Sequence, residues 1–278
     1  MLVSAIIPCY NAQSTIGRAM DSLLQQTVVI DQIIVINDGS TDASLEVLNA
    51  YQLQHGQIVI INQENQGVGV ARNNAIRKAL GTYILTLDGD DFFEPSFVEK
   101  ALIKFSENDN LGAVMCGYTR VVNGEKILPY IPEPISFQSC LMHNGAISCL
   151  LFKKKAILEA GLYDEQMQLG YEDWDLNIRI LKLGYVYGVV REVLFNYTDT
   201  DASRNDRAEL KDLELRMQLF YKYREDYEQH SAYFFKEFIK ENNRLKKENQ
   251  RIKNSTSFKY SHSIITLLER LKNIFKSN

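Results

Sequence analysis

Four short apolar segments, separated by stretches of helix length, dominate the N-terminal part of the chain. The apolar segments are residues 3–7, 32–36, 58–61 and 83–87, and the intervening stretches are 15–25, 42–53 and 69–80. In the first of these stretches the apolar residues fall on one helical stripe: Ile16, Ala19, Met20, Leu23 and Leu24. Buried strands that alternate with helices are typical of βαβ units. The pattern predicts an α/β fold with a mixed, mainly parallel sheet flanked by helices.

Polar loops follow each of the four predicted strands. They comprise residues 8–11, 37–40, 65–67 and 88–91. In open α/β sheets ligands bind beyond the carboxyl ends of the strands, where loops and helix N-termini converge. We therefore expect the functional site at this edge of the sheet.

The loop after the fourth strand reads Asp88-Gly89-Asp90-Asp91. Closely spaced carboxylates repel each other, and a divalent cation relieves that repulsion. Oxygen ligands suit Mg²⁺ or Mn²⁺, and such ions usually complete their shell with substrate phosphates. Gly89 allows a tight turn that directs the flanking carboxylates to one place. The alternative is a solvated loop whose aspartates cap the helix near Pro95.

Two other loops carry residues suited to a nucleotide. Gly67 and Gly69 open a predicted helix, and Arg72 follows one turn later, which fits a diphosphate cradle. The alternative is a glycine-rich turn with Arg72 in a surface salt bridge. Asp38 directly follows a buried strand and suits the imide N–H of a uracil-type base, although it is equally suited to forming a turn.

A second group of acids, Glu172, Asp173 and Asp175, lies at the start of a predicted helix. Acids there complement the helix dipole. A carboxylate at this place can also act as a general base toward a hydroxyl. Trp174, the only tryptophan of the chain, either stacks on a sugar or belongs to the core.

The composition and the net charge argue against several classes of function. A net charge of −4 over 278 residues argues against a nucleic-acid partner. The four cysteines form no CxxC pair, which indicates reduced thiols in a cytoplasmic protein. The N-terminus lacks the basic region of a leader, and no apolar run approaches the roughly 20 residues of a membrane span. We expect a cytoplasmic protein, at most peripheral on the inner face of the plasma membrane.

The second half is less regular. Three prolines between residues 129 and 134 indicate a loop, and a strand is expected around residues 146–152. After residue 201 the composition shifts: residues 207–253 are charged and helical, and 264–275 form a basic amphipathic helix. Residues 1–205 and 206–278 are therefore predicted as a catalytic domain and a C-terminal helical extension. That extension either contacts an anionic membrane, packs on the catalytic domain or pairs with a second subunit. Leu245 and Ile252 are one heptad apart, fewer repeats than a coiled coil needs.

Taken together, five segments in this order resemble the family-2 glycosyltransferases of the GT-A fold. Residues 4–11 are similar to the family's first strand and donor loop, and 33–42 to its base-binding segment. Residues 65–73 resemble its phosphate-side helix, 88–91 its metal motif and 172–176 its catalytic-base motif. The resemblance runs from residue 3 to about 204.

The resemblance implies a role for each matched residue. The donor would be bound by Pro8, Tyr10, Asn11, Asp38, Asn65, Gly67, Arg72, Asp88 and Gly89. Asp38 would hold the base, Asp88 would face the ribose or the metal, and Asp90 would be the main ligand of Mn²⁺ or Mg²⁺. Asp173 would be the general base, with Glu172 and Trp174 near the acceptor. The enzyme would transfer a hexose or N-acetylhexosamine from a nucleotide-sugar donor, in particular a UDP-sugar. Transfer to a glycan or lipid-linked acceptor would invert the anomeric centre during surface polysaccharide or glycolipid assembly.

Two departures from the family pattern stand out. Asn37 replaces an aspartate, and residues 196–204 lack the family's histidine, which leaves Arg204 as a candidate phosphate partner. A non-catalytic nucleotide-sugar-binding or assembly protein is the alternative function. A nucleotidyltransferase would carry a glycine-rich loop with a basic residue after the first strand, and residues 8–11 are not such a loop.

Overall fold

The computed structural model of the chain describes residues 2–122, 124–198, 211–258 and 260. The chain divides into two compact units, Met1–Tyr223 and Arg224–Asn278. The first unit therefore includes α9 (Asp212–Lys222), which composition grouped with the extension beginning at residue 206. Arg204 and the predicted helix 264–275 lie outside the described residues. Within the described part no helix is both long and apolar enough to cross a membrane.

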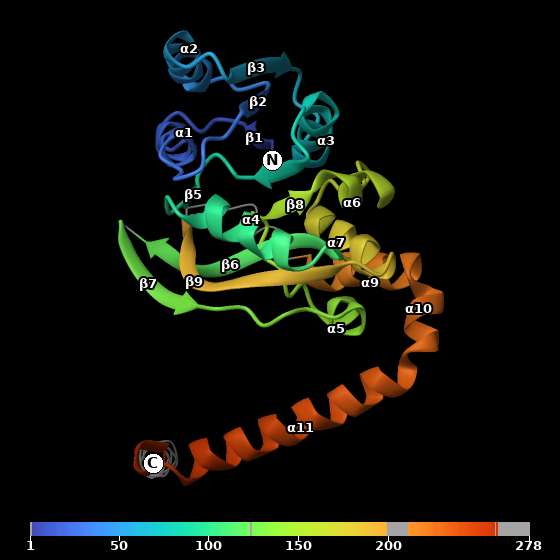
Figure 1. Cartoon of the computed structure of the whole chain (residues 1–278). Helices are drawn as coiled ribbons and strands as arrows, with labels where there is room; N and C mark the ends of the chain where they lie inside the picture. The colour runs from blue at the N-terminus through green and yellow to red at the C-terminus, as the bar shows by residue number, and fades with distance from the viewer. Residues whose placement is uncertain (1, 123, 199–210, 259, 261–278) are drawn as a thin grey trace, which may run out of the picture. The chain divides into compact units, whose positions relative to one another are not determined.

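A nine-stranded sheet forms the centre of the first unit (Figure 1). Its strands are β1 (Val3–Cys9), β2 (Gln32–Asp38), β3 (Ile58–Gln63), β4 (Tyr83–Thr86), β5 (Phe92–Phe93), β6 (Leu111–Val122), β7 (Glu125–Tyr130), β8 (Leu151–Lys153) and β9 (Val186–Thr198). Their spatial order is β3-β2-β1-β4-β8-β6-β9-β5, with β7 on β6. The first four strands are mutually parallel, and β8 runs antiparallel to β4 and β6. The predicted α/β architecture is confirmed.

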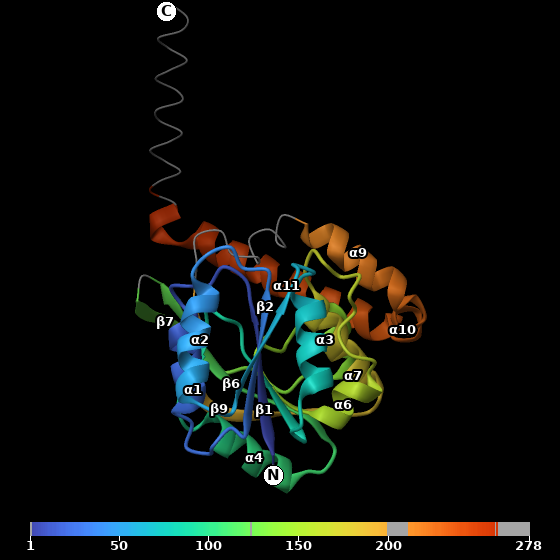
Figure 2. The same ribbon diagram turned by 90° about the horizontal axis from the view of Figure 1, so that it is seen from above.

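Helices cover both faces of the parallel half, as Figures 1 and 2 show. The helices α1 (Ile16–Leu24) and α2 (Ser44–Gln54) lie on one face, and α3 (Val68–Lys78) lies on the other. The described residues of this unit also form α4 (Phe97–Glu107), α5 (Phe137–Met142), α6 (Lys154–Glu159) and α7 (Glu172–Lys182). Because each crossover from one parallel strand to the next passes over a face of the sheet, the loops at the strands' carboxyl ends meet at one edge.

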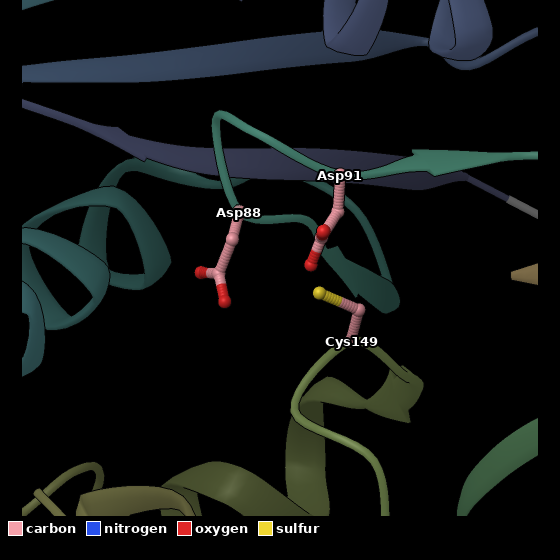
Figure 3. A group of neighbouring side chains, drawn as sticks. All are labelled: Asp88, Asp91 and Cys149. Carbon is pink, nitrogen blue, oxygen red and sulfur yellow. The ribbon is translucent and has the colours of Figure 1, made fainter. Parts of the chain in front are cut away.

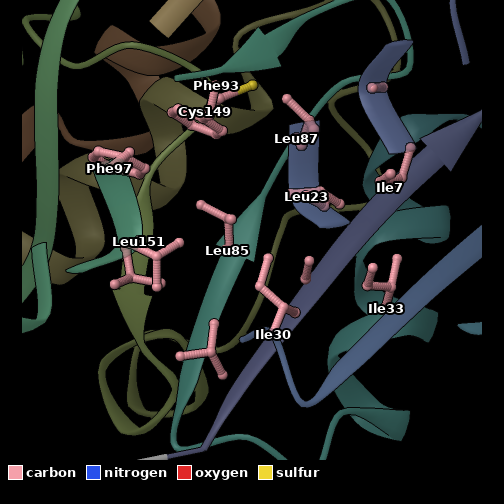
Figure 4. Close-up of a cluster of buried hydrophobic side chains, with 14 of the residues drawn as sticks. Ile7, Leu23, Ile30, Ile33, Leu85, Leu87, Phe93, Phe97, Cys149 and Leu151 are labelled. Carbon is pink, nitrogen blue, oxygen red and sulfur yellow. The ribbon is translucent and has the colours of Figure 1, made fainter. Parts of the chain in front are cut away.

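One cluster of buried apolar side chains fills the space between the sheet and one helical layer. Strand residues Ile7, Ile33 and Leu85 pack there with Leu23 of α1, and all four are fully or almost fully buried (Figure 4). Burial of apolar surface on this scale is the main stabilising contribution to such a fold. It fixes the strands whose ends carry the polar loops.

The strand expected around residues 146–152 is wrong for residues 146–150. Only β8 (Leu151–Lys153) pairs in the sheet, and residues 143–150 form a loop. At this point Thr86 donates its backbone N–H to the Leu150 carbonyl at 3.0 Å, while its hydroxyl oxygen accepts the backbone N–H of Leu150 at 2.9 Å. A side chain of β4 thus takes the place of a backbone ladder partner, and the chain before Leu150 is left to form a loop near the site.

The second unit contains α10 (Arg224–Gln229) and α11 (Ser231–Asn254). His230 separates them and donates its backbone N–H to the carbonyl of Asp226. Helix formation predicted over residues 207–253 is therefore confirmed for the described part of that range, which contains α9, α10 and α11.

Candidate functional site

Three side chains that can ligate a metal converge at the carboxyl end of β4. Asp88 and Asp91 come from the loop between β4 and β5, and Cys149 comes from the loop before β8 (Figure 3). One ligand atom from each lies within 4.8 Å of the others. The cluster includes only one of the two sequence-predicted ligands, because Asp90 is replaced in it by Asp91. The backbone carbonyl of Asp90 instead accepts a hydrogen bond from the Arg18 guanidinium at 2.9 Å.

The acidic cluster of Asp88, Asp91 and Cys149 combines one partly exposed carboxyl group with one that has little access to water. Asp91 is almost completely buried, and desolvation, together with Asp90 and Asp88, raises the pKa of its carboxyl well above the ordinary value. Its Oδ1 accepts the backbone N–H of Thr198 at 2.8 Å. Burial also raises the pKa of the Cys149 thiol, which favours the neutral form. Two carboxylates in such a place fit a hard divalent cation.

Arg72 joins this cluster to the second group of acids. Its Nη2 lies 2.6 Å from Asp88 Oδ1, and its Nη1 lies 2.9 Å from Glu172 Oε1. The Arg72 side chain is 1% exposed, Glu172 is 2% exposed and Asp88 is 23% exposed, so this ion triad is largely buried and is not a surface salt bridge. Burial lowers the pKa of the guanidinium, but Asp88, Tyr163 and Glu172 raise it to a net value well above normal. Arg72 therefore stays charged.

The Arg72 guanidinium is held from a third side by an aromatic ring. Its Cζ lies 5.2 Å from the centroid of the Tyr163 ring, in cation–π geometry. Its Nε is buried and makes no hydrogen bond. Both terminal nitrogens are engaged with carboxylates, so the side chain links protein groups to each other within the site.

Asp38 orders the loop between β3 and α3. Its Oδ1 accepts the side-chain amide of Gln63 at 2.8 Å and the backbone N–H of Gln66 at 2.9 Å. Its Oδ2 accepts the backbone N–H of Gly67 at 2.9 Å. Gly67 has φ +89°, a conformation that glycine adopts without strain. The loop thereby starts α3 in a fixed position.

The neighbouring loop after β1 is locked to the loop after β2. Asn11 has φ +50°, and its Oδ1 accepts the backbone N–H of Thr41 at 2.8 Å. The Asn11 N–H in turn donates to Ser40 Oγ at 3.1 Å. Tyr10 is exposed beside this junction and Pro8 is half-buried at the end of β1. These contacts bring the three predicted donor-loop residues to the same edge as Asp38.

Gly39 allows the close approach of two neighbouring loops, whereas Gly89 is not required for one. Gly39 has φ +73°, and a Cβ placed there would lie 2.9 Å from the backbone nitrogen of Asn65. A Cβ on Gly89 would lie 3.6 Å from the carbonyl oxygen of Pro8, which is ordinary contact. Asn65 is thus pressed against the loop after β2, while the space at Gly89 tolerates a small side chain.

The three acids at the start of α7 have three different partners. Glu172 binds Arg72, as described above, and Asp175 accepts the hydroxyl of Tyr223 at 2.6 Å and pairs with Arg179 at 2.7 Å. Asp173 is half-buried, and its Oδ2 accepts the side-chain amide of Asn144 at 2.9 Å. A shared position at a helix N-terminus therefore does not give these carboxylates a shared role.

Asp173 is the end of a chain of hydrogen bonds that reaches into the core. The buried Tyr187 hydroxyl donates to Asn177 Oδ1 at 2.7 Å, and Asn177 Nδ2 donates to Asn144 Oδ1 at 3.1 Å. Asn144 Nδ2 then donates to Asp173. Sequence reasoning missed Asn144 and Tyr187, because no local motif marks residues that meet only in the folded chain.

Trp174 is a packed residue. It is 3% exposed, and its indole N–H donates to the backbone carbonyl of Cys140 at 2.5 Å. The Arg216 guanidinium of α9 lies 5.0 Å from the ring centroid, and the Tyr171 ring lies 5.0 Å away on α7's N-cap. Of the two sequence interpretations, this environment favours the core. Tyr171 is the less buried of the two rings.

The chain is similar in sequence to known glycosyltransferases. The family model described as glycosyl transferase family 2 matches residues 4–153. Chondroitin synthase of Escherichia coli is 41% identical over 113 residues, which is 41% of this chain and 16% of that protein. The uncharacterized glycosyltransferase EpsJ of Bacillus subtilis is 37% identical over 134 residues, 48% of this chain and 38% of that protein. The chain thus spans less than half the length of these two relatives.

Two further comparisons cover more of the chain. The uncharacterized glycosyltransferase RT0329 of Rickettsia typhi is 30% identical over 217 residues, covering 74% of this chain and 67% of that protein. The crystal structure of S. aureus TarS 1–349 in complex with UDP-GlcNAc matches with a TM-score of 0.62 at 18% identity, covering 74% of this chain and 61% of that one. At this identity the match to TarS concerns the fold, which is that of GT-A glycosyltransferases.

Proposed function

The chain belongs to glycosyl transferase family 2, and from this premise we propose that it moves a sugar from a nucleoside diphosphate donor to an acceptor hydroxyl with inversion. The observation that supports this most is the buried triad, in which Arg72 ties Asp88 to Glu172. The acidic cluster and Glu172, which directly precedes the proton acceptor Asp173 in α7, are thereby held on the two sides of one guanidinium. A transferase with two substrates needs this arrangement, because the donor and the acceptor hydroxyl must meet in a fixed geometry.

The donor binds on the side of β1, β2 and α3. The base lies against Asp38 and the loop that Asp38 orders, beside Pro8, Tyr10 and Asn11. The backbone N–H groups at the start of α3, after Gly67, offer hydrogen bonds to the diphosphate. Uracil is the base we propose, because the TarS structure named above contains UDP-GlcNAc.

Asp88 and Asp91 would hold Mn²⁺ or Mg²⁺ through their oxygens. When bound, the cation stabilises the charge that develops on the departing diphosphate. The protonated Cys149 thiol beside them is a poor ligand for either ion. Asp90 remains a candidate ligand from the sequence. A comparison of Asp90→Asn with Asp91→Asn for Mn²⁺ affinity decides which of the two neighbours contributes the second carboxylate.

Asp173 acts as the general base. Its carboxylate takes the proton from the acceptor hydroxyl while that oxygen attacks the anomeric carbon and the bond to the diphosphate breaks. Asn144 is a positioning residue, because its amide holds Oδ2 and so orients the carboxylate. The hydrogen bonds from Tyr187 and Asn177 fix the Asn144 amide in turn. Glu172 orders the acceptor side through Arg72.

The test of this function begins with the donor. UDP-sugars carrying hexose and N-acetylhexosamine are screened with Mn²⁺ by thermal shift, and the best ligand is used in a transfer or hydrolysis assay. Asp173→Asn should reduce turnover by about 10²- to 10⁴-fold while the donor dissociation constant stays unchanged. Asp109→Asn changes an exposed carboxylate in the loop between α4 and β6, where the Asp109 carbonyl accepts Lys153 Nζ; it is the matched control and should leave both values unchanged.

Two results would contradict the proposal. If no nucleotide sugar stabilised the protein against heat, the proposed donor site would be contradicted. Equal losses of donor affinity and turnover in Asp173→Asn would remove the assignment of the base. For Asn144, the variants Asn144→Ala and Asn144→Asp should both lower kcat with little change in donor KM. Because Asn144→Asp places a second carboxylate beside Asp173, it should also move the pH–rate profile to higher pH, which a purely structural defect would not do.

We propose a growing glycan or a lipid-linked saccharide as the acceptor. The E. coli relative is named a chondroitin synthase, and a Pasteurella multocida relative is named a hyaluronan synthase. This chain spans only 16% and 12% of those two proteins, so the acceptor has to be tested directly. Transfer of labelled sugar to membrane extracts and to soluble oligosaccharides separates a lipid-linked acceptor from a free glycan.

A further inference from the structure

Helix α11 carries an apolar stripe that the second unit leaves exposed. It is continuous over Ser231–Asn254, and none of its residues is buried. Five large apolar side chains on it are 41–69% exposed: Phe235, Phe238, Ile239, Leu245 and Ile252. On a helix these spacings place the side chains along one face. A stripe of this kind on a long helix usually has a partner.

The stripe follows a heptad repeat. Residues 235–241, 242–248 and 249–255 form three heptads, the last ending on the helix's C-cap. The d positions are Phe238, Leu245 and Ile252, and the a positions are Phe235, Asn242 and Asn249. Leu245 and Ile252 by themselves span fewer heptads than a coiled coil needs. The unbroken helix extends the pattern back to Phe235 and supplies the three repeats.

The charges beside the stripe are complementary to those of a second copy of this chain. Glu241 and Glu248 occupy g positions, and Lys246 and Lys253 occupy e positions. In two parallel helices in register, each g residue faces the e residue of the following heptad on the partner. Glu241 then meets the second copy's residue 246, and Glu248 meets its residue 253. In an antiparallel pair, glutamates would face glutamates and lysines would face lysines.

The two asparagines select the same arrangement. In a parallel, in-register pair Asn242 and Asn249 each lie opposite their own copy, where two amides can hydrogen bond to each other. An antiparallel pair would set each amide against an apolar d residue and leave its polar atoms without partners. An asparagine at an a position is also typical of two-stranded coiled coils.

We propose that α11 forms a parallel, in-register, two-stranded coiled coil with a second copy of this chain. The intrahelical ion pairs do not oppose it. Arg244 pairs with Glu241 at 2.6 Å and with Glu248 at 3.3 Å, but these groups are exposed and such pairs contribute little. Lys246 and Lys253 make no ion pair within the part of the chain that the structure describes. Three heptads with two buried asparagines give a weak dimer whose formation depends on concentration.

The charge pattern is tested on the full chain by sedimentation equilibrium over a range of concentrations. The wild-type protein should be a monomer–dimer mixture. Glu241→Lys/Glu248→Lys places lysines opposite the lysines at e and should be monomeric. Lys246→Glu/Lys253→Glu should be monomeric for the opposite reason. An equimolar mixture of the two variants should regain the dimer, since each supplies the charge that the other needs.

The matched control changes the same charges off the interface. Lys240 and Lys247 occupy f positions, on the outer face of the coiled coil. Lys240→Glu/Lys247→Glu therefore makes the same change in net charge as the e-position variant and should dimerise like the wild-type protein. Circular dichroism confirms that each variant keeps its helix content, so a loss of association is not a loss of folding.

The register is tested by a disulfide. The four native cysteines are buried, so Leu245→Cys introduces a single accessible thiol at a d position. Parallel, in-register helices place the two copies of this thiol side by side, and mild oxidation should link them in the full chain. Lys247→Cys, on the outer face, should link poorly under the same conditions.

Three outcomes would overturn the proposal. A wild-type chain that stays monomeric at all concentrations would mean that the stripe packs on its own chain. Dimers that persist in both charge variants would place the interface elsewhere. Flotation with anionic vesicles that depends on Phe235 and Phe238, without any dimer, would make a membrane the partner. None of these results bears on sugar transfer, which is measured separately.

Discussion

The buried triad makes Arg72→Met the most informative single change in the molecule. At an effective dielectric constant of about 20, unit charges about 4 Å apart attract each other by about 4 kcal/mol, and Arg72 has two such partners. Much of this attraction offsets the cost of burying the charges. Removal of one partner from a buried pair is nevertheless known to cost about 3–5 kcal/mol, because the remaining charge is left uncompensated. Glu172 is left buried without its partner, whereas Asp88 is 23% exposed and partly solvated, so we expect a loss of about 3–5 kcal/mol.

Arg77→Met is the matched control, on the same helix and of the same residue type. Its pair with Glu165 spans 3.3 Å between side chains that are 51% and 45% exposed, so the loss should be at most about 1 kcal/mol. Urea unfolding followed by circular dichroism at pH 7.5 and pH 5 measures both. The Arg72→Met loss should shrink at pH 5, because protonation removes the uncompensated charge.

Arg72→Lys separates charge from geometry. A single ammonium keeps the charge but lacks the planar fork that reaches two carboxylates at once, so we expect a loss between those of the other two variants. Equal losses in Arg72→Met and Arg77→Met, or a loss in Arg72→Met that is independent of pH, would refute the reasoning that the triad is held by buried charge.

Two further predictions concern the carboxylates of the site. Burial and the neighbouring acids raise the pKa of Asp91 above the unfolded value near 3.8, so its favourable contribution to stability is complete below that pH and is lost as the pH rises toward the folded pKa. In EDTA the urea midpoint of the wild-type protein should therefore fall as the pH is raised from about 4. The Asp91→Asn variant should show a smaller fall, and Mn²⁺ should reverse the fall only in the wild-type protein. An identical slope in both proteins would mean that Asp91 is not the cause of the fall. Asp38→Asn turns an amide donor toward N–H groups that now donate to a carboxylate, and it should cost about 1–3 kcal/mol of stability and weaken UDP-sugar binding, both measurable by thermal titration.

Local sequence patterns determined the α/β fold, the edge of the sheet that carries the polar loops, and the family. These features depend on hydrophobic periodicity and on residues adjacent in the chain, such as Asp88 to Asp91. Such patterns survive in the sequence because burial of one face is repeated along each element. The heptad on α11 needed both the sequence and the structure. Its residues are close together in the sequence, but only the continuous, exposed helix shows that they form one stripe.

The tertiary structure alone decided which partner each polar side chain takes. From the sequence, Arg72 was expected to bind a phosphate or to form a surface salt bridge. In the folded chain it instead pairs with Glu172, which is one hundred residues away in the sequence. Glu172, Asp173 and Asp175 look alike in the sequence, yet each has a different partner. Asn144 and Cys149 reach the site because Thr86 interrupts the strand before Leu150. The energy of a polar group depends on burial and on distances of a few ångströms to residues remote in the chain, and neither quantity is written in a local motif.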